Sequence, residues 1–222
     1  LTVGTARIAL IREPDGGYHY ESHSWPARWA GLFQKDRRHE TSSGRLQGAS
    51  IRPDKYRYLR TGGSKERAAH LTFDWDKGQV VNNVAGSRWK MHIPAGTQDK
   101  LSTQLGMMLA LARGTTDFSF AVADGGTLKK FHYKVVGEET LELPAGTFRT
   151  VKVMNTRDDD RYRSMAWCAP ALNYLPVRIR RREKDETEYT SELEHFSEAL
   201  RVNANRDIAV PRSSPTEAGM GK

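Results

Sequence analysis

The chain has 222 residues, of which 37% are hydrophobic and 28% are charged, and its formal net charge is +8 at pH 7. This composition is too apolar for an intrinsically disordered protein. No run approaches the roughly 20 apolar residues of a membrane-spanning helix, and a single cysteine excludes an internal disulfide and a multi-cysteine metal site. The positive charge suits anionic partners in general, such as nucleic acids and lipid headgroups, and does not choose among them.

Alternating apolar and polar residues predict a strand at the start of the chain. Residues 5–11 and 18–24 alternate in this way, and the turn sequence Pro-Asp-Gly-Gly at 14–17 predicts that they form a hairpin. The alternation already runs through Leu1, as in a strand that is under way. We therefore expect Leu1 to be a boundary within a longer chain. Any export or anchoring segment would lie upstream, which leaves peripheral or anchored membrane association open.

Large aromatic residues interrupt the strand pattern after the first hairpin. Trp25, Trp29 and Phe33 follow one another at near-helical spacing. Such residues either plug the end of a β-barrel, which is the plainer interpretation, or line the mouth of an apolar cavity. Met107 and Met108 present the same alternatives, because methionine fills gaps in cores and also lines adaptable lipid pockets. These five residues are the candidate binding site for an apolar ligand.

Residues 97–114, TQDKLSTQLGMMLALARG, form the clearest predicted helix. Thr97 is a candidate N-cap, and Gly114 follows the last turn, where glycine commonly ends a helix. An isolated helix of this length is marginal in water, so we expect its apolar face to be buried against the concave side of a β-sheet. That face consists of Leu101, Leu105, Met108, Leu109 and Ala112.

The rest of the chain consists of short predicted strands joined by turns, a pattern typical of an all-β sandwich or barrel. We expect one β-rich, barrel-like domain over residues 1–197. Residues 198–222 lose periodicity and gain Pro, Ser and Gly, which predicts a flexible tail. The further predicted hairpins join 68–75 to 79–84, 118–124 to 128–136, 147–156 to 161–168, and 174–182 to 187–196.

Cys168 allows two interpretations. A catalytic thiol needs a depressed pKa and a nearby base, and the nearest histidines in sequence, His132 and His195, lie outside its segment. Free cysteine is among the most buried residue types, and Trp167 and Ala166 beside it favour packing. We therefore predict that Cys168 is a core residue.

Arginines dominate the strand that follows Cys168. With a three-residue loop at 184–186, the last hairpin separates charged from apolar residues on opposite faces, which is the expected register. The arginines are then mainly a solvated strand face, and contact with an anionic ligand is the alternative. The charged face pairs Arg178 with Glu192, Arg180 with Thr190 and Arg182 with Glu188, and the other face pairs Val177 with Leu193 and Ile179 with Ser191.

Other polar residues give weaker signals. His19 and His23 share one face of a predicted strand, but zinc needs three or four ligands and no third lies nearby in sequence, so no metal site is predicted. Asp74 and Asp76 straddle a predicted turn, where solvent exposure is the plainer explanation than an acid/base pair.

Four short motifs follow one another along the chain: Ser43-Gly44 with Arg52-Pro53-x-x-Tyr56, then Phe73-Asp74-Trp75, then Gln98-Asp99-x-Leu101-Ser102, then Leu175-Pro176-Val177-Arg178. In this order they resemble the bacterial family catalogued as domain of unknown function 3108. The similarity runs from Leu1 to about Phe196.

The resemblance implies an exported protein of the Gram-negative cell envelope, without an agreed activity and without catalytic residues to transfer. It also implies a mainly β fold similar to lipoprotein carriers, in which an antiparallel curved sheet or barrel-like meander wraps around one central α-helix. Fold alone does not fix function.

We therefore expect a non-catalytic periplasmic protein with no cofactor and no nucleic-acid partner. It would bind a lipid, a lipoprotein or an envelope protein in support of outer-membrane or cell-surface assembly. The alternatives are a filled structural interaction module without a ligand, and an enzyme that acts on an anionic envelope polymer through Asp74, Asp76 or Cys168.

Overall fold

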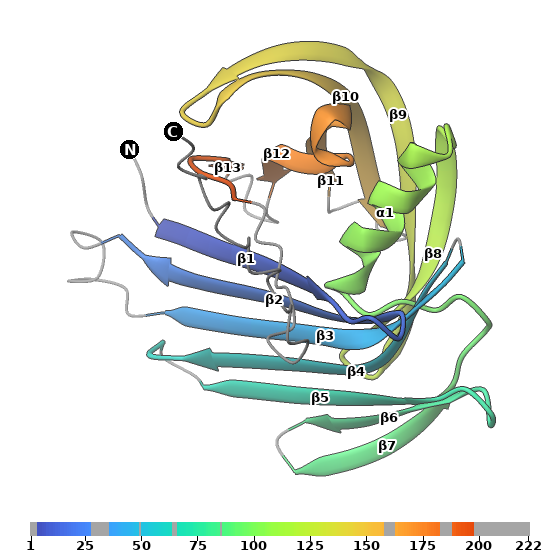
Figure 1. The fold of residues 1–222 in the computed structure, drawn as a ribbon. Coiled ribbons are helices and arrows are strands. Elements are labelled where there is room, and N and C mark those ends of the chain that lie inside the picture. Colours follow the sequence, from blue (N-terminus) through green and yellow to red (C-terminus); the bar gives the residue numbers. More distant parts are fainter. Residues whose placement is uncertain are drawn as a thin grey trace, which may run out of the picture.

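The computed structural model describes residues 4–27, 36–48, 50–63, 66–84, 86–157, 163–182 and 188–197. Two antiparallel sheets, each with its strands in chain order, curve around one α-helix. Figure 1 shows the helix lying between the sheets, with the long β9–β10 hairpin arching over it. The predicted fold class, a curved antiparallel meander around a central helix, is confirmed.

The first sheet has seven strands joined as a simple meander. Residues directly opposite one another in neighbouring strands share a face, so Tyr18 and Tyr20, both buried, mark the concave face that looks toward the helix. The strands are β1 (Gly4–Arg12), β2 (Gly17–Pro26), β3 (Arg37–Gln47), β4 (Ser50–Thr61), β5 (Arg67–Asp74), β6 (Gln79–Val84) and β7 (Ser87–His92).

The second sheet has six strands and is also a meander. A short 3₁₀ helix, η2 (Pro170–Leu172), joins two of its strands. The strands are β8 (Asp117–Asp124), β9 (Thr127–Leu143), β10 (Gly146–Arg157), β11 (Arg163–Ala169), β12 (Leu175–Arg182) and β13 (Glu188–Glu192).

The helix α1 (Ser102–Ala112) buries two faces, not one. Leu105 is 4% exposed and packs in the cluster of the first sheet, with Met108 and Leu109 partly buried beside it. Met107 and Leu111 point the other way, into the cluster of the second sheet. The predicted stripe is therefore only one of the two buried faces, and Ala112 is exposed. The physical reason is that a helix packed between two sheets is shielded from water on both sides, so apolar residues are favoured on both faces.

The start of the helix corrects the predicted N-cap. Asp99 Oδ1 accepts hydrogen bonds from the backbone N–H groups of Leu101 and Ser102, both at 2.8 Å. Thr97 instead closes the preceding turn, because its hydroxyl donates to the Pro94 carbonyl oxygen. The carboxylate of Asp99 thus accepts from the N–H of Ser102, the first residue of α1, and from that of Leu101, which precedes it at the N-cap, two groups that have no intrahelical partner. The predicted end is confirmed, since Gly114 has a φ of 76°.

The residue beside this cap joins the two sheets. Gln98 forms a parallel bridge with Val122 of β8, and its side-chain Nε2 donates to the Ile51 carbonyl oxygen of β4 at 2.8 Å. The Gln98-Asp99 motif is therefore a buried link between helix, first sheet and second sheet.

The Ser-Gly and Arg-Pro motifs are explained by packing. Gly44 lies at a β-bulge against β4, where a Cβ atom would be 2.1 Å from the Arg52 carbonyl oxygen. Trp75 Nε1 donates to the Pro53 carbonyl oxygen at 2.8 Å, and the Arg52 guanidinium lies over the Trp75 ring. These contacts hold β3, β4 and the end of β5 together.

The register predicted for the last hairpin is confirmed. Arg178 lies opposite Glu192, Arg180 opposite Thr190 and Arg182 opposite Glu188. The predicted loop at 184–186 and the tail over 198–222 lie outside the described residues. Within the described parts of the chain, α1 is too short to cross a membrane, and no other helix is long and apolar enough to do so.

Candidate functional site

A small polar pocket lies where the turn between β8 and β9 meets the concave face of the first sheet. Its volume is about 70 Å³, and one wall comes from Tyr56, Tyr58 and Leu71. Lys100, which precedes the helix, and Asp124, at the end of β8, form part of the opposite wall. This volume has room for a few waters or for a ligand group of a few heavy atoms.

Close packing fixes the position of the β8–β9 turn. Gly126 has a φ of 83°, and a Cβ atom there would lie 2.3 Å from the Trp89 ring of β7. Glycine is required on both counts, because the backbone is left-handed and the indole leaves no space for a side chain. The turn is thereby held against the first sheet, beside the pocket.

Asn82 of β6 is the unusual residue of the pocket. Its side chain is fully buried and lines the pocket, yet neither Nδ2 nor Oδ1 has a hydrogen-bond partner among the described residues. Leaving a buried polar group unpaired costs about 1–3 kcal/mol. This amide, in the wall of the pocket, has the unpaired donor and acceptor that a polar occupant would satisfy.

Two lysines hold the carboxylate of Asp124 in its charged form. Lys100 Nζ lies 2.9 Å from Asp124 Oδ1, and Lys129 Nζ lies 2.6 Å from Oδ2. Burial acts to raise the pKa of Asp124, but the two ammonium groups outweigh it and the pKa falls below its ordinary value. Lys100 also lies over the Tyr58 ring, 5.8 Å from its centroid.

A row of arginines crosses the concave face beside the pocket. Arg60 lies directly opposite Arg38 on one side and Arg67 on the other. Asp36 forms ion pairs with Arg38 and Arg60, at 3.2 and 2.8 Å. Arg67 lines the pocket and has no ion pair among the described residues. Because like charges opposite one another destabilise a sheet, this row favours an anionic ligand group near Arg67.

Of the five residues predicted to bind an apolar ligand, the three that the structure describes do not lie together. Trp25 is 40% exposed near the end of β2, whereas Met107 is buried in the cluster of the second sheet and Met108 packs toward the first. Trp29 and Phe33 lie outside the described residues. The role of these five residues in ligand binding stays a prediction.

Cys168 is a core residue, as predicted. It is 0% exposed in the cluster of the second sheet, and burial raises the pKa of its thiol to about 12. Asp74 lies at the turn between β5 and β6, where its carboxylate binds Lys77 at 2.8 Å. Neither Cys168 nor Asp74 lines the pocket.

The arginines of β12 lie on the second sheet, around an indole ring. Arg178 is bonded to Glu192 at 2.8 Å, and both Arg178 and Arg180 lie over the Trp167 ring. Arg178 is thus less solvated than predicted, with a side chain 20% exposed, while Arg180 and Arg182 are exposed. Anion contact by these arginines stays a prediction.

The predicted shared face of His19 and His23 is confirmed, since both lie in β2 four residues apart. His23 lies beside His39 of the neighbouring strand and beside Glu21, with the two imidazoles stacked at 3.8 Å. His19 shares their face of β2 but is not part of this group.

Sequence reasoning missed the pocket residues, although one signal was present. In the strand QVVNNV, Val80 and Asn82 share a face, and Val80 is 0% exposed. A polar residue on the buried face of a strand is unusual and marks a candidate site.

Comparison with known proteins identifies related folds and one family. The chain is similar to a crystal structure described as a beta-barrel-like protein of domain of unknown function DUF1849 from Brucella abortus, with a TM-score of 0.56 and 10% sequence identity over 86% of each chain. At that identity the likeness concerns the fold alone. No curated protein matches the sequence.

The family comparison covers most of the chain, including both sheets and the helix. The model of one family matches residues 1–194, in agreement with the motifs seen in the sequence. This chain therefore belongs to the family described as protein of unknown function DUF3108.

Proposed function

We propose that this chain is a non-catalytic binding domain of the bacterial periplasm, and that its pocket holds the anionic headgroup of an envelope lipid. The observation that carries the proposal is the fully buried, unpartnered amide of Asn82 in a pocket bordered by the cations of Arg67 and Lys100. The resemblance to exported envelope proteins supports the periplasmic location.

The size of the pocket and the packing of the core favour a headgroup over an enclosed acyl chain. Pockets that enclose a drug-sized ligand have volumes of roughly 300–1,000 Å³, against about 70 Å³ here. Around the helix, Val80, Val122 and Val153 are each 0% exposed, so the described core is filled by protein side chains. A lipid would then be held by its polar end, with its chains left to a membrane or a partner.

The pocket has the chemistry for such a group. The Asn82 amide donates and accepts hydrogen bonds, which suits a glycerol or sugar hydroxyl, and the Arg67 guanidinium suits a phosphate oxygen. Asp124, neutralised by two lysines, can accept from a further hydroxyl.

The test measures binding of the purified chain to vesicles of phosphatidylglycerol and of phosphatidylcholine, and binding of glycerol 1-phosphate by NMR. We expect preference for phosphatidylglycerol, and weaker binding by Arg67→Gln. The control is Arg88→Gln, which makes the same charge change on the opposite face of the first sheet, where Arg88 of β7 is exposed.

Asn82→Leu separates the pocket from general electrostatics. It keeps the charge, should abolish binding of glycerol 1-phosphate, and should stabilise the free protein by about 1–3 kcal/mol because it removes an unpaired buried amide. Equal binding to both vesicle types, or equal losses in Arg67→Gln and Arg88→Gln, would contradict the proposal. Those results would favour the filled interaction module that the dense packing around α1 also fits.

A further inference from the structure

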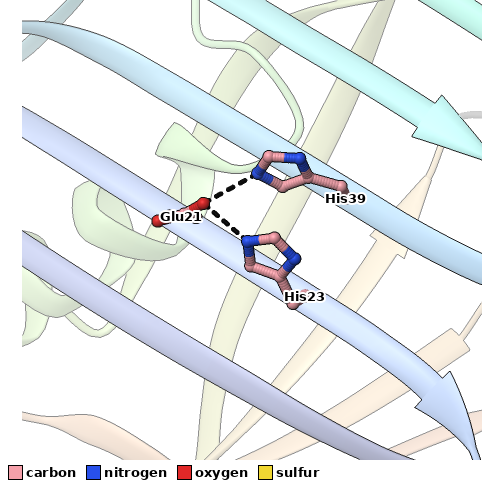
Figure 2. Close-up of side chains that lie close together, drawn as sticks. All are labelled: Glu21, His23 and His39. Atoms are coloured by element: carbon pink, nitrogen blue, oxygen red, sulfur yellow. Dashed lines mark hydrogen bonds and ion pairs between the residues drawn. The ribbon is translucent and has the colours of Figure 1, made fainter.

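Three side chains converge on the convex face of the first sheet, opposite to the pocket. His23 of β2 lies directly across from His39 of β3, and their rings stack with centroids 3.8 Å apart and planes 17° from parallel. Glu21 precedes His23 by two residues and so projects from the same face of β2. Figure 2 shows the two imidazoles turned toward one carboxylate.

The geometry brings three potential metal-ligand atoms close together. Nε2 of His23 is 2.6 Å and Nε2 of His39 is 2.8 Å from the same oxygen, Oε1 of Glu21. All three atoms lie within 4.8 Å of one another. A tetrahedral zinc ion with bonds of about 2.0–2.1 Å needs its ligands roughly 3.3 Å apart. The two nitrogen–oxygen contacts therefore have to lengthen by only about 0.5–0.7 Å to hold such an ion.

We propose that Glu21, His23 and His39 form a binding site for a divalent transition metal, with Zn²⁺ as the ion that fits best. Two imidazole nitrogens and one carboxylate oxygen are the donor set of three-ligand zinc sites, whose fourth position is taken by water or another ligand. The cluster is partly exposed, with side chains 30–44% accessible, which leaves that position open to solvent. Mg²⁺ and Ca²⁺ prefer oxygen ligands and fit poorly.

Two neighbours on the same face set the expected affinity. Arg7 of β1 lies directly opposite His23, and its charge opposes a bound cation. Leu59 of β4 lies opposite His39 and contributes no ligand. The site therefore depends on three ligands from two rigid, paired strands, and removing the charge of Arg7 should strengthen metal binding.

The second sheet offers a matched control. His132 Nε2 lies 2.7 Å from Asp117 Oδ1, with similar exposure, so this pair makes the same type of hydrogen bond with only two donor residues. If a histidine–carboxylate contact were enough for binding, this pair would also hold zinc. The comparison isolates what the third ligand adds.

The experiment titrates the untagged, metal-free chain with Zn²⁺ in competition with a chromophoric chelator, and records the absorption of Co²⁺ as a substitute. We expect one ion per chain and a tetrahedral or five-coordinate Co²⁺ spectrum. His23→Gln and His39→Gln should each weaken Zn²⁺ binding by more than the roughly 10–100-fold that loss of an outer-sphere partner costs. His132→Gln should change nothing, Arg7→Gln should tighten binding, and Mg²⁺ should not compete.

A second readout keeps the test independent of any activity. Zn²⁺ should raise the thermal midpoint of the wild type, because it links β2 to β3 in the folded state alone, and should not raise that of Glu21→Gln. The substituted side chains are on the convex surface, and circular dichroism checks that each variant is folded. Zn²⁺ affinity in the His23→Gln/His39→Gln double variant equal to that of the wild type would overturn the proposal, as would loss of binding in His132→Gln alone.

Discussion

The two sides of the helix differ in what they bury. Toward the six-stranded sheet the core is apolar, with Val122, Val153 and Cys168 each 0% exposed. Toward the seven-stranded sheet the core is mixed, because polar side chains are buried among the tyrosines and aliphatic residues. Both sides contact the same helix, so the difference lies in the sheets.

The polar side contains one satisfied network and several unsatisfied groups. Tyr18 Oη and Asp99 Oδ2 both contact Ser42 Oγ, at 3.0 and 2.6 Å. Asn82 and the hydroxyl of Tyr20 have no partner among the described residues. Buried polar groups of this kind reduce stability. The comparison indicates that the six-stranded side is a packing scaffold, and that the concave face of the seven-stranded sheet is the place to look for binding.

The largest expected effect is on stability, and it tests whether side chains fill the core equally on the two sides of the helix. Leu105→Ala, on the first-sheet side, and Leu111→Ala, on the second-sheet side, should each lower the free energy of unfolding by about 2–5 kcal/mol. Chemical denaturation measures both. A much smaller cost for Leu105→Ala would mean that the first-sheet side encloses a cavity, and an apolar fluorescent probe should then bind the wild type.

The second effect concerns the buried carboxylate on the polar side. Burial raises the pKa of Asp99 to about 6, against opposing hydrogen bonds from Ser42, Leu101 and Ser102. Since the folded pKa exceeds the unfolded value of 3.8, the folded state binds the proton more tightly, and the contribution of Asp99 to stability is lost as pH rises from about 4 to about 6.

Asp99→Asn removes this titration while an amide can still accept from the helix N–H groups. Relative to the wild type, the variant should therefore gain stability between pH 4 and pH 7, by an amount on the order of 3 kcal/mol. Urea unfolding at the two pH values gives the difference. A variant whose stability relative to the wild type does not change over this range would show that Asp99 is already charged in the folded protein at pH 4.

A smaller effect is expected on the apolar side. Cys168→Ala should cost about 1 kcal/mol, the usual scale for a small truncation in a core, and should leave lipid binding unchanged. A thiol reagent should react with Cys168 only when the protein unfolds, because the side chain is 0% exposed. If Cys168→Ala lost lipid binding while its thermal midpoint stayed unchanged, the thiol would have a functional role. The six-stranded side would then no longer be a packing scaffold alone.

The smallest effect is on the outside of the six-stranded sheet. Arg180 is exposed and lies over the Trp167 ring, and the residue directly opposite it in β13 is the uncharged Thr190. Arg180→Glu should shift stability by less than about 1 kcal/mol. Arg178→Glu should cost more, because Arg178 is better buried and bonded to Glu192. Thermal unfolding compares the two, and the reverse order would show that Trp167 depends mainly on Arg180.

Sequence alone determined those features that depend on local pattern. Alternation with a period of two located the hairpins that contain β1 with β2, β5 with β6, and β8 with β9. The register of the last hairpin was predicted correctly, because separating its charges from Val177 and Ile179 allows only one register. The hairpin of β3 and β4 was not predicted, since the sequence RRHETSSGRLQ is too polar to show alternation.

Only the tertiary structure decided what depends on elements that meet from distant parts of the chain. The helix pattern could not reveal a second buried face, which exists because a second sheet lies there. Asn82 is in a pocket because the β8–β9 turn docks beside it, and His23 meets His39 because β2 and β3 pair in one particular register. These strand pairings decide which side chains are buried and which meet across strands. The free energy that selects one pairing over another comes from the packing of the whole core, so no local stretch of sequence can reveal these contacts.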